Sequence, residues 1–218
     1  MKRNNRHESI KRITRLAMFI AIEAIVCFVP FLGSIQIGPV VATLAMIPVI
    51  IVGMTYGILY GSILGAVAGL FSFIWWTFID SSNPSAMLFT PWNAYTTTYR
   101  NYWPLVICFV PRILTGTVAG GLSSLFSKIM KTPTGQKKIV TLLVNVCVGI
   151  ISSLVNTILV LFGTYLLWGK KYAELSGIEF DILLKTIMTI VLTNGLFEAL
   201  VGGIVGSSVT LALKTLKA

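Results

Sequence analysis

The sequence has 218 residues, of which 56% are hydrophobic and 11% are charged, and its mean hydropathy is +0.87. Soluble domains carry about 25% charged residues, so this composition excludes a soluble catalytic domain and indicates an integral membrane protein. The net charge of +10 does not indicate a nucleic-acid partner, because the basic residues lie at the ends of apolar segments, where they suit the anionic surface of a lipid bilayer.

Apolar runs bounded by glycine, proline or charge predict an all-α membrane protein, a bundle of six transmembrane helices. A hydrocarbon core about 30 Å thick needs about 20 residues for each helical crossing. One membrane domain, residues 1–218, therefore takes up the chain. The spans are expected at 12–33, 39–54, 57–79, 105–127, 139–167 and 181–213.

Most of the basic residues fall in three regions: the N-terminal tail, the segment between the fourth and fifth spans, and the C-terminal end. With six crossings, these regions share one side of the membrane, and the positive-inside rule places both termini in the cytoplasm. The residues are Lys2, Arg3, Arg6, Lys11, Arg12, Arg15, Lys128, Lys131, Lys137, Lys138, Lys214 and Lys217.

The sequence lacks the motifs of an enzyme. Its one histidine, His7, lies in the charged tail, which excludes an HExxH site and a histidine-based triad. The segment 163–171 comes nearest to a phosphate-binding loop, but its glycines are one residue too far apart and its last residue is Lys171 instead of Ser or Thr. Seven scattered acidic residues and three cysteines without CxxC spacing predict no metal site and no cofactor.

A long segment at 80–104 joins the third and fourth spans on the outer side and mixes aromatic, hydroxyl and amide side chains. Loops of this length are commonly lids or binding loops, which makes Asn93, Tyr95 and Arg100 candidate ligand-binding residues. The alternative is an interfacial belt of Trp and Tyr without a further role.

Four charged residues lie more than three residues from either end of an expected span: Glu23, Arg112, Lys185 and Glu198. Such groups are costly in hydrocarbon and usually mark a functional site or a necessary pair. Lys185 lies near a span end and can extend to the interface. Arg112 either pairs with Glu198 across the bundle or uses its planar guanidinium to bind an anionic ligand.

Two amides and two tryptophans complete the candidate site. Asn156 and Asn194 lie inside apolar helices, where an unpaired amide is costly. They bond either to neighbouring helices or to hydroxyl and amide groups of a ligand. Trp75 and Trp76, at the outer end of the third span, offer flat apolar walls.

Small residues recur at helical spacing on two spans. In lipid, such stripes let helix backbones approach closely. On the third span we expect the stripe to serve internal packing, whereas on the first span it serves either internal packing or contact with another subunit. The stripes are Gly57, Gly61, Gly65 and Gly69 on the third span, and Ala17, Ala21 and Ala24 on the first.

Taken together, these features resemble the substrate-binding S components of energy-coupling factor (ECF) transporters, which import vitamins into bacteria. The resemblance covers nearly the whole chain and rests on its size, the six predicted spans, the Ala17 and Ala21 pair and the long outer segment. It also rests on the stretches IGPVVATLAMIPVIIVGMTYG and ICFVPRILTGTVAGG. These two stretches are most similar to the members that take pantothenate.

The resemblance implies a non-catalytic subunit of the bacterial cell membrane that captures a vitamin, with pantothenate first, from outside. Such a subunit docks on a transmembrane coupling subunit through its first helix and topples to release its ligand, while two partner ATPases hydrolyse ATP with Mg²⁺. Ala17 and Ala21 match the family's docking motif, and Ala24 extends it. The ligand-binding candidates rest on chemistry and depth alone: Arg112, Arg100, Asn93, Tyr95, Trp75, Trp76, Asn156 and Asn194.

Several alternatives stay open. Riboflavin, folate or a thiamine precursor could stack on Trp75, Trp76 or Trp92. A self-sufficient channel or secondary transporter would be expected to show inverted repeats with broken helices or a relay of acidic groups. A membrane enzyme would need a nucleophile, base or metal set, which the sequence lacks, and a structural bundle is the last alternative.

Overall fold

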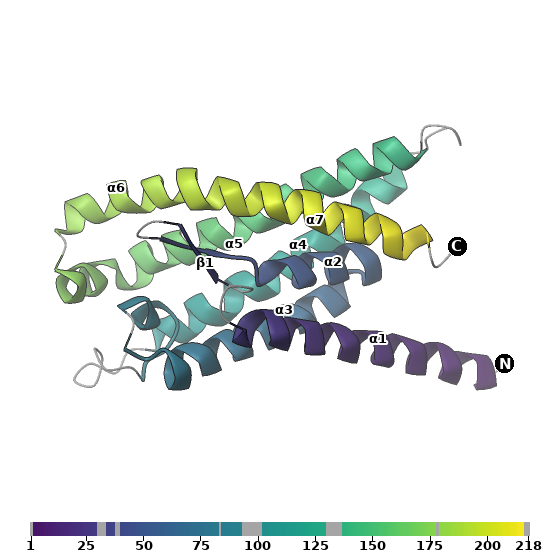
Figure 1. Cartoon of the computed structure of the whole chain (residues 1–218), viewed down its shortest axis with the longest axis horizontal. Helices are drawn as coiled ribbons and strands as arrows, with labels where there is room; N and C mark the ends of the chain where they lie inside the picture. The colour runs from purple at the N-terminus through teal and green to yellow at the C-terminus, as the bar shows by residue number, and fades with distance from the viewer. Residues whose placement is uncertain are drawn as a thin grey trace.

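The computed structural model describes residues 2–29, 34–37, 40–82, 84–92, 102–129, 137–177 and 179–215. Long helices lie side by side along one axis (Figure 1). Three short helical turns, η1 (Trp75–Ile79), η2 (Pro84–Leu88) and η3 (Val191–Gly195), accompany them. The helices are α1 (Lys2–Phe28), α2 (Met46–Tyr56), α3 (Ile58–Ile74), α4 (Trp103–Ile129), α5 (Lys137–Ser176), α6 (Phe180–Ile190) and α7 (Leu196–Thr215).

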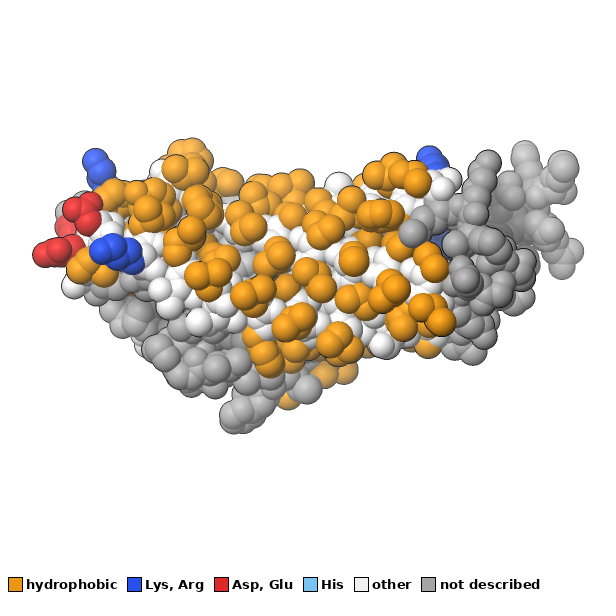
Figure 2. All heavy atoms as spheres, turned by 90° about the horizontal axis from the view of Figure 1, so that it is seen from above, with side chains coloured by type: hydrophobic (Ala, Val, Ile, Leu, Met, Phe, Trp, Pro, Cys, Tyr) orange, Lys and Arg blue, Asp and Glu red, His pale blue; other side chains and the backbone are white. Residues whose placement is uncertain are grey.

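Four helical segments in the described part of the chain are long and apolar enough to cross a bilayer: Ile58–Ile79, Trp103–Ile129, Ile139–Leu167 and Phe180–Leu213. The shortest has 22 residues, about 33 Å at 1.5 Å per residue, which matches a hydrocarbon core about 30 Å thick. One face of the molecule is covered by hydrophobic side chains along its middle, and charged side chains gather at the end where α5 meets α6 (Figure 2). The protein is therefore a helical membrane protein.

The structure corrects one expected boundary. The sequence places the start of a span at residue 39, but β1 (Ser34–Ile37) pairs antiparallel with β2 (Val40–Thr43), with Ile37 opposite Val40. Two valines and a threonine in β2 favour a strand, so α2 begins later, at Met46. Helix α1 also ends earlier than expected, at Phe28 and not at 33. The apolar span within α5, Ile139–Leu167, has the expected bounds, and the helix itself continues to Ser176.

The glycine stripe of α3 faces α4. A Cβ atom at Gly61 would lie 2.5 Å from the carbonyl oxygen of Gly116, so the two backbones touch without side chains between them. Gly57, with φ of +92°, adopts a conformation that other residues rarely reach and lets α2 turn directly into α3. The stripe serves internal packing.

The short helix α2 forms the centre of the bundle (Figure 1). Val49, Ile50 and Val52 are completely buried, because α2 packs against α3, α4 and α7. The N and C ends of the chain lie at one end of the bundle, and the connection from α5 to α6 lies at the other (Figure 1). We call these the terminal end and the far end.

Candidate functional site

Arg112 lies in the middle of α4 and is only 6% exposed. Its Nη1 donates a hydrogen bond of 2.7 Å to the Cys108 carbonyl oxygen one turn earlier. Its guanidinium carbon lies 4.8 Å from the centre of the Phe89 ring, a favourable cation–π distance. Its Nε has no hydrogen-bond partner among the described residues. The side chain is thus fixed in place but retains donor capacity.

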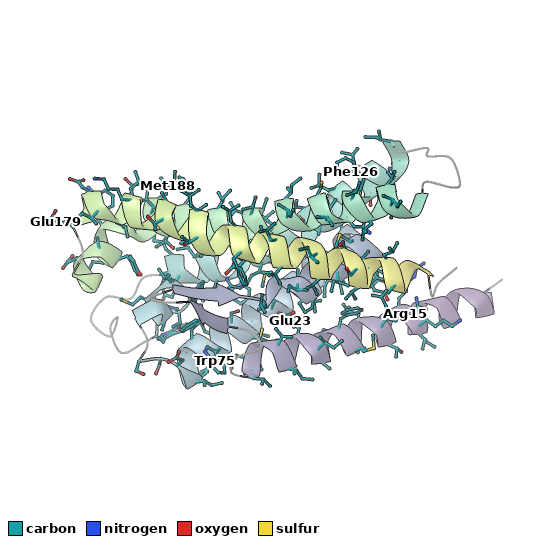
Figure 3. The ribbon with its side chains drawn as sticks, turned by 45° about the horizontal axis from the view of Figure 1, so that its top comes forward. Arg15, Glu23, Trp75, Phe126, Glu179 and Met188 are labelled. Carbon is teal, nitrogen blue, oxygen red and sulfur yellow. The ribbon has the colours of Figure 1, made fainter. Side chains whose placement is uncertain are left out.

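Aromatic side chains form a wall next to Arg112 on the side of the far end. Phe89, just after η2, stacks on Trp76 of η1 with ring centres 5.6 Å apart. The Thr77 hydroxyl donates a 2.8 Å hydrogen bond to the Thr90 hydroxyl, which joins the two segments. Trp75, at the start of η1 (Figure 3), turns instead toward α1 and packs on Phe28 at 6.3 Å. Of the two tryptophans, Trp76 is therefore the one connected to Arg112.

Glu23 lies on the side of α1 that faces the bundle and is completely buried (Figure 3). Its Oε1 accepts a hydrogen bond of 3.3 Å from the Cys27 thiol. Its Oε2 has no partner within the described part of the structure. Because an unpaired buried carboxyl oxygen is costly, this atom needs a further partner.

Glu23 and Arg112 lie at the same position along the long axis of the bundle, which we call the same height. Helices α1 and α3 run in the same direction (Figure 1), and the Phe28 and Phe71 rings meet at 5.4 Å. Glu23 precedes Phe28 by five residues and therefore lies about 7.5 Å closer to the terminal end of the bundle. This places Glu23 beside residues 65–67 of α3. The Arg112 carbonyl packs directly on Gly65. In agreement with this common height, the Arg112 guanidinium interacts electrostatically with the Glu23 carboxyl.

Helix α5 brings further polar groups to this height. It runs antiparallel to α4, and a Cβ at Gly163 would lie 3.6 Å from Ile107. Arg112, five residues after Ile107, is therefore level with residue 158 of α5. Asn156 lies within about 3 Å of that height; it is 7% exposed, and its Oδ1 has no partner among the residues described.

A hydrogen bond ties α7 to the same height. The Thr157 hydroxyl donates to Glu198 Oε2 at 3.2 Å. Four helices thus contribute polar side chains at one depth, and we call this set the polar layer: Glu23, Arg112, Asn156, Thr157 and Glu198. The structure gives Arg112 and Glu198 different hydrogen-bond partners, the Cys108 carbonyl and the Thr157 hydroxyl.

The other predicted residues divide into two groups. Asn93, Tyr95 and Arg100 lie outside the described residues, and of Asn194 only the backbone, in η3, is described. On α1, Ala17 and Ala21 are exposed and Ala24 is half-buried. Since Glu23 is buried, the alanine stripe and Glu23 lie on different sides of the same helix.

Sequence reasoning assigned no role to three residues of this region. Glu23 stood out as a charge within a span, but nothing in its neighbourhood in sequence pairs it with Arg112. Thr157 could have been noticed, because it follows Asn156 in an apolar helix. Phe89 is one aromatic residue among many in its segment, and its contact with Arg112 depends on the tertiary structure.

A separate hollow of about 400 Å³ opens at the far end, where α5 meets α6. It lies beside the stacked rings of Tyr165 and Phe180, 5.1 Å apart. Lys171 at its edge pairs with Glu174 at 2.8 Å. Tyr165 is eight residues from Thr157 along α5, about 12 Å, so this hollow is distinct from the polar layer.

The polar layer lies inside a lipid-embedded helical bundle and keeps hydrogen-bonding atoms without a partner among the described residues, an arrangement that can bind a polar solute within the bilayer. The family described as ECF transporter, substrate-specific component, matches residues 11–213, and the chain belongs to this family. Members of this family are substrate-binding subunits of transporters and are not catalytic. The chain is also 32% identical over 193 residues to the pantothenic acid transporter PanT of Lactococcus lactis subsp. cremoris (strain MG1363), covering 85% of this chain and 91% of PanT.

Proposed function

We propose that this protein is the substrate-capture subunit of an ECF importer and that its substrate is pantothenate. The observation that supports this substrate is the 32% identity to PanT, which extends over 91% of that protein. The family match, over residues 11–213, includes every position of the polar layer.

The chemistry of the polar layer fits this substrate. Pantothenate carries a carboxylate, an amide, two hydroxyls and a dimethyl carbon. Arg112 retains donors for the carboxylate after bonding Cys108. The unpaired Oδ1 of Asn156 can accept from a hydroxyl or amide donor, and Trp76 supplies an apolar wall. Arg100, Asn93, Tyr95, Asn194 and Trp75 remain proposed contacts.

The proposed topology has six membrane crossings in one domain, with both termini in the cytoplasm of a bacterial cell. The two chain ends lie at the same end of the bundle (Figure 1), which supports an even number of crossings. The continuous apolar segments supply four of these, and we assign the other two to α1 and α2. α2 is only 11 residues long, about 16 Å, and crosses together with the segment before it.

In the proposed mechanism, the substrate enters from the far end and is held between the polar layer and the aromatic wall. The loaded subunit then docks on a transmembrane coupling subunit through Ala17, Ala21 and Ala24 and topples to release the substrate inward. The work comes from ATP with Mg²⁺ on two partner ATPases, and this chain itself uses no cofactor.

Mass spectrometry of the purified protein tests the substrate. We expect pantothenate to copurify, and calorimetry in detergent should give tighter binding for pantothenate than for riboflavin, folate or thiamine precursors. Copurification of one of those flat vitamins would assign a different substrate to the same family. Reconstituted alone in vesicles, the protein should not accumulate pantothenate against a gradient, and uphill uptake without partners would instead indicate a secondary transporter.

A further inference from the structure

We propose that Glu23 is a further substrate-binding residue and that its Oε2 forms a hydrogen bond with a hydroxyl group of the substrate. This inference rests on the proposed function, because it assigns a specific part of pantothenate to a specific side chain. Glu23 lies on α1, the helix whose alanine stripe we propose as the docking surface.

The first reason is that Glu23 Oε2 needs a partner. The side chain is 0% exposed, and while Oε1 accepts from Cys27, Oε2 has no partner among the described residues. In the bilayer interior, water is scarce, and a buried oxygen without a hydrogen bond is costly in free energy. A substrate group that supplies the missing bond would recover this free energy on binding.

The second reason is the position of a second unpaired atom. Arg112 Nε is also buried and lacks a partner in the described structure, and Arg112 lies at the same height as Glu23 on a different helix. The two groups interact electrostatically. Unpaired atoms on α1 and α4 at one depth are the arrangement expected when a ligand completes the hydrogen bonds.

A hydroxyl group suits Glu23 better than a carboxylate does. A hydroxyl both donates and accepts, so it bonds Oε2 whether Glu23 is ionised or protonated. A substrate carboxylate would repel an ionised Glu23 and belongs on the remaining donors of Arg112. Glu23 and Arg112 together therefore select a substrate that carries both a hydroxyl and a carboxylate.

Calorimetry on the full-length protein in detergent tests this assignment with two ligands: pantothenate and the analogue that lacks both hydroxyls. The test variant is Glu23→Met, which keeps the side-chain length but removes the hydrogen bond. Glu23→Gln keeps an oxygen at the same place. Phe19→Leu is the packing control, because Phe19 is buried one turn earlier on the same helix.

We expect Glu23→Met to weaken pantothenate binding about tenfold or more, the loss of one buried hydrogen bond to a charged or strongly polar group. Glu23→Gln and Phe19→Leu should stay within about threefold of the wild type, which is less than 1 kcal/mol. The analogue should bind wild type and Glu23→Met with the same affinity, since it has no hydroxyl to lose. A melting curve for each variant checks folding, and Glu23→Leu repeats the test if the Met variant does not fold.

Two results would overturn the inference while leaving the proposed function intact. One is unchanged pantothenate affinity in Glu23→Met. The other is an equal loss for pantothenate and the analogue, which would make Glu23 a structural residue whose Oε2 bonds buried water. If the wild type binds no pantothenate at all, the proposed substrate and the role of Glu23 both fail.

Discussion

Gly65 of α3 packs directly on the carbonyl group of Arg112 of α4, so that a Cβ atom at position 65 would strike the Arg112 backbone. Arg112, the basic residue of the polar layer, is therefore positioned by a glycine on the neighbouring helix. Gly65→Ala should push α4 away and displace Arg112. We expect a destabilisation of about 1–3 kcal/mol, typical of overpacking, and weaker pantothenate binding.

Thermal unfolding and calorimetry in detergent measure both effects. Gly121→Ala is the matched control, because its new Cβ would lie 4.0 Å from the nearest atom, the end of the flexible Ile58 side chain. Alanine is also the better helix former, so this variant should be as stable as the wild type or more stable. Equal melting temperatures for the two variants would mean that α3 and α4 can separate at little cost.

Replacing Arg112 should weaken the binding of a carboxylate substrate. Arg112→Ala removes the guanidinium from a buried position, and we expect at least a tenfold loss of affinity, about 1.4 kcal/mol or more. Arg112→Lys keeps the charge but not the planar fork, so it should recover part of the affinity. Isothermal calorimetry measures both variants, and affinity equal to the wild type in Arg112→Ala would make Arg112 a structural residue.

The ring of Phe89 should matter through its contact with Arg112. Phe89→Leu removes the ring that lies 4.8 Å from the guanidinium and stacks on Trp76. Such contacts contribute about 0.5–1.5 kcal/mol, so we expect pantothenate affinity to fall several-fold. Phe78→Leu is the control, because Phe78 is 74% exposed. An equal, small effect of both substitutions would show that the ring does not position Arg112.

The alanine stripe of α1 should affect transport and not binding. Ala17 and Ala21 are exposed, whereas the candidate site lies on the other side of α1. Ala17→Trp or Ala21→Trp should therefore abolish pantothenate uptake by cells that contain the coupling subunit and ATPases, while the purified subunit binds pantothenate as before. The bulky ring prevents close approach of a partner helix.

Ala212→Trp is the control for added bulk, since Ala212 is an exposed alanine on α7. It should leave uptake unchanged. Normal uptake in both α1 variants would show that this stripe is not the docking surface. Lost uptake in the control would show that any added tryptophan disturbs the transporter.

The sequence by itself determined the class of the protein and its family, and it supplied candidates for the site. Composition is a property of the whole chain, and the glycine and alanine stripes repeat every four residues, so both can be seen without knowing how the helices pack. Arg112 and Asn156 were identified because polar groups in apolar helices are costly wherever they lie.

Only the tertiary structure decided how these residues combine. Glu23, Arg112, Asn156 and Glu198 come from four different helices, and their common depth depends on where those helices meet, such as Gly65 on Arg112 and Gly163 on Ile107. The β1–β2 pair forms because two short segments hydrogen-bond with each other, which hydropathy does not record. Hydropathy gives the depth of a residue along its own helix, but the register between helices depends on contacts between residues far apart in the chain.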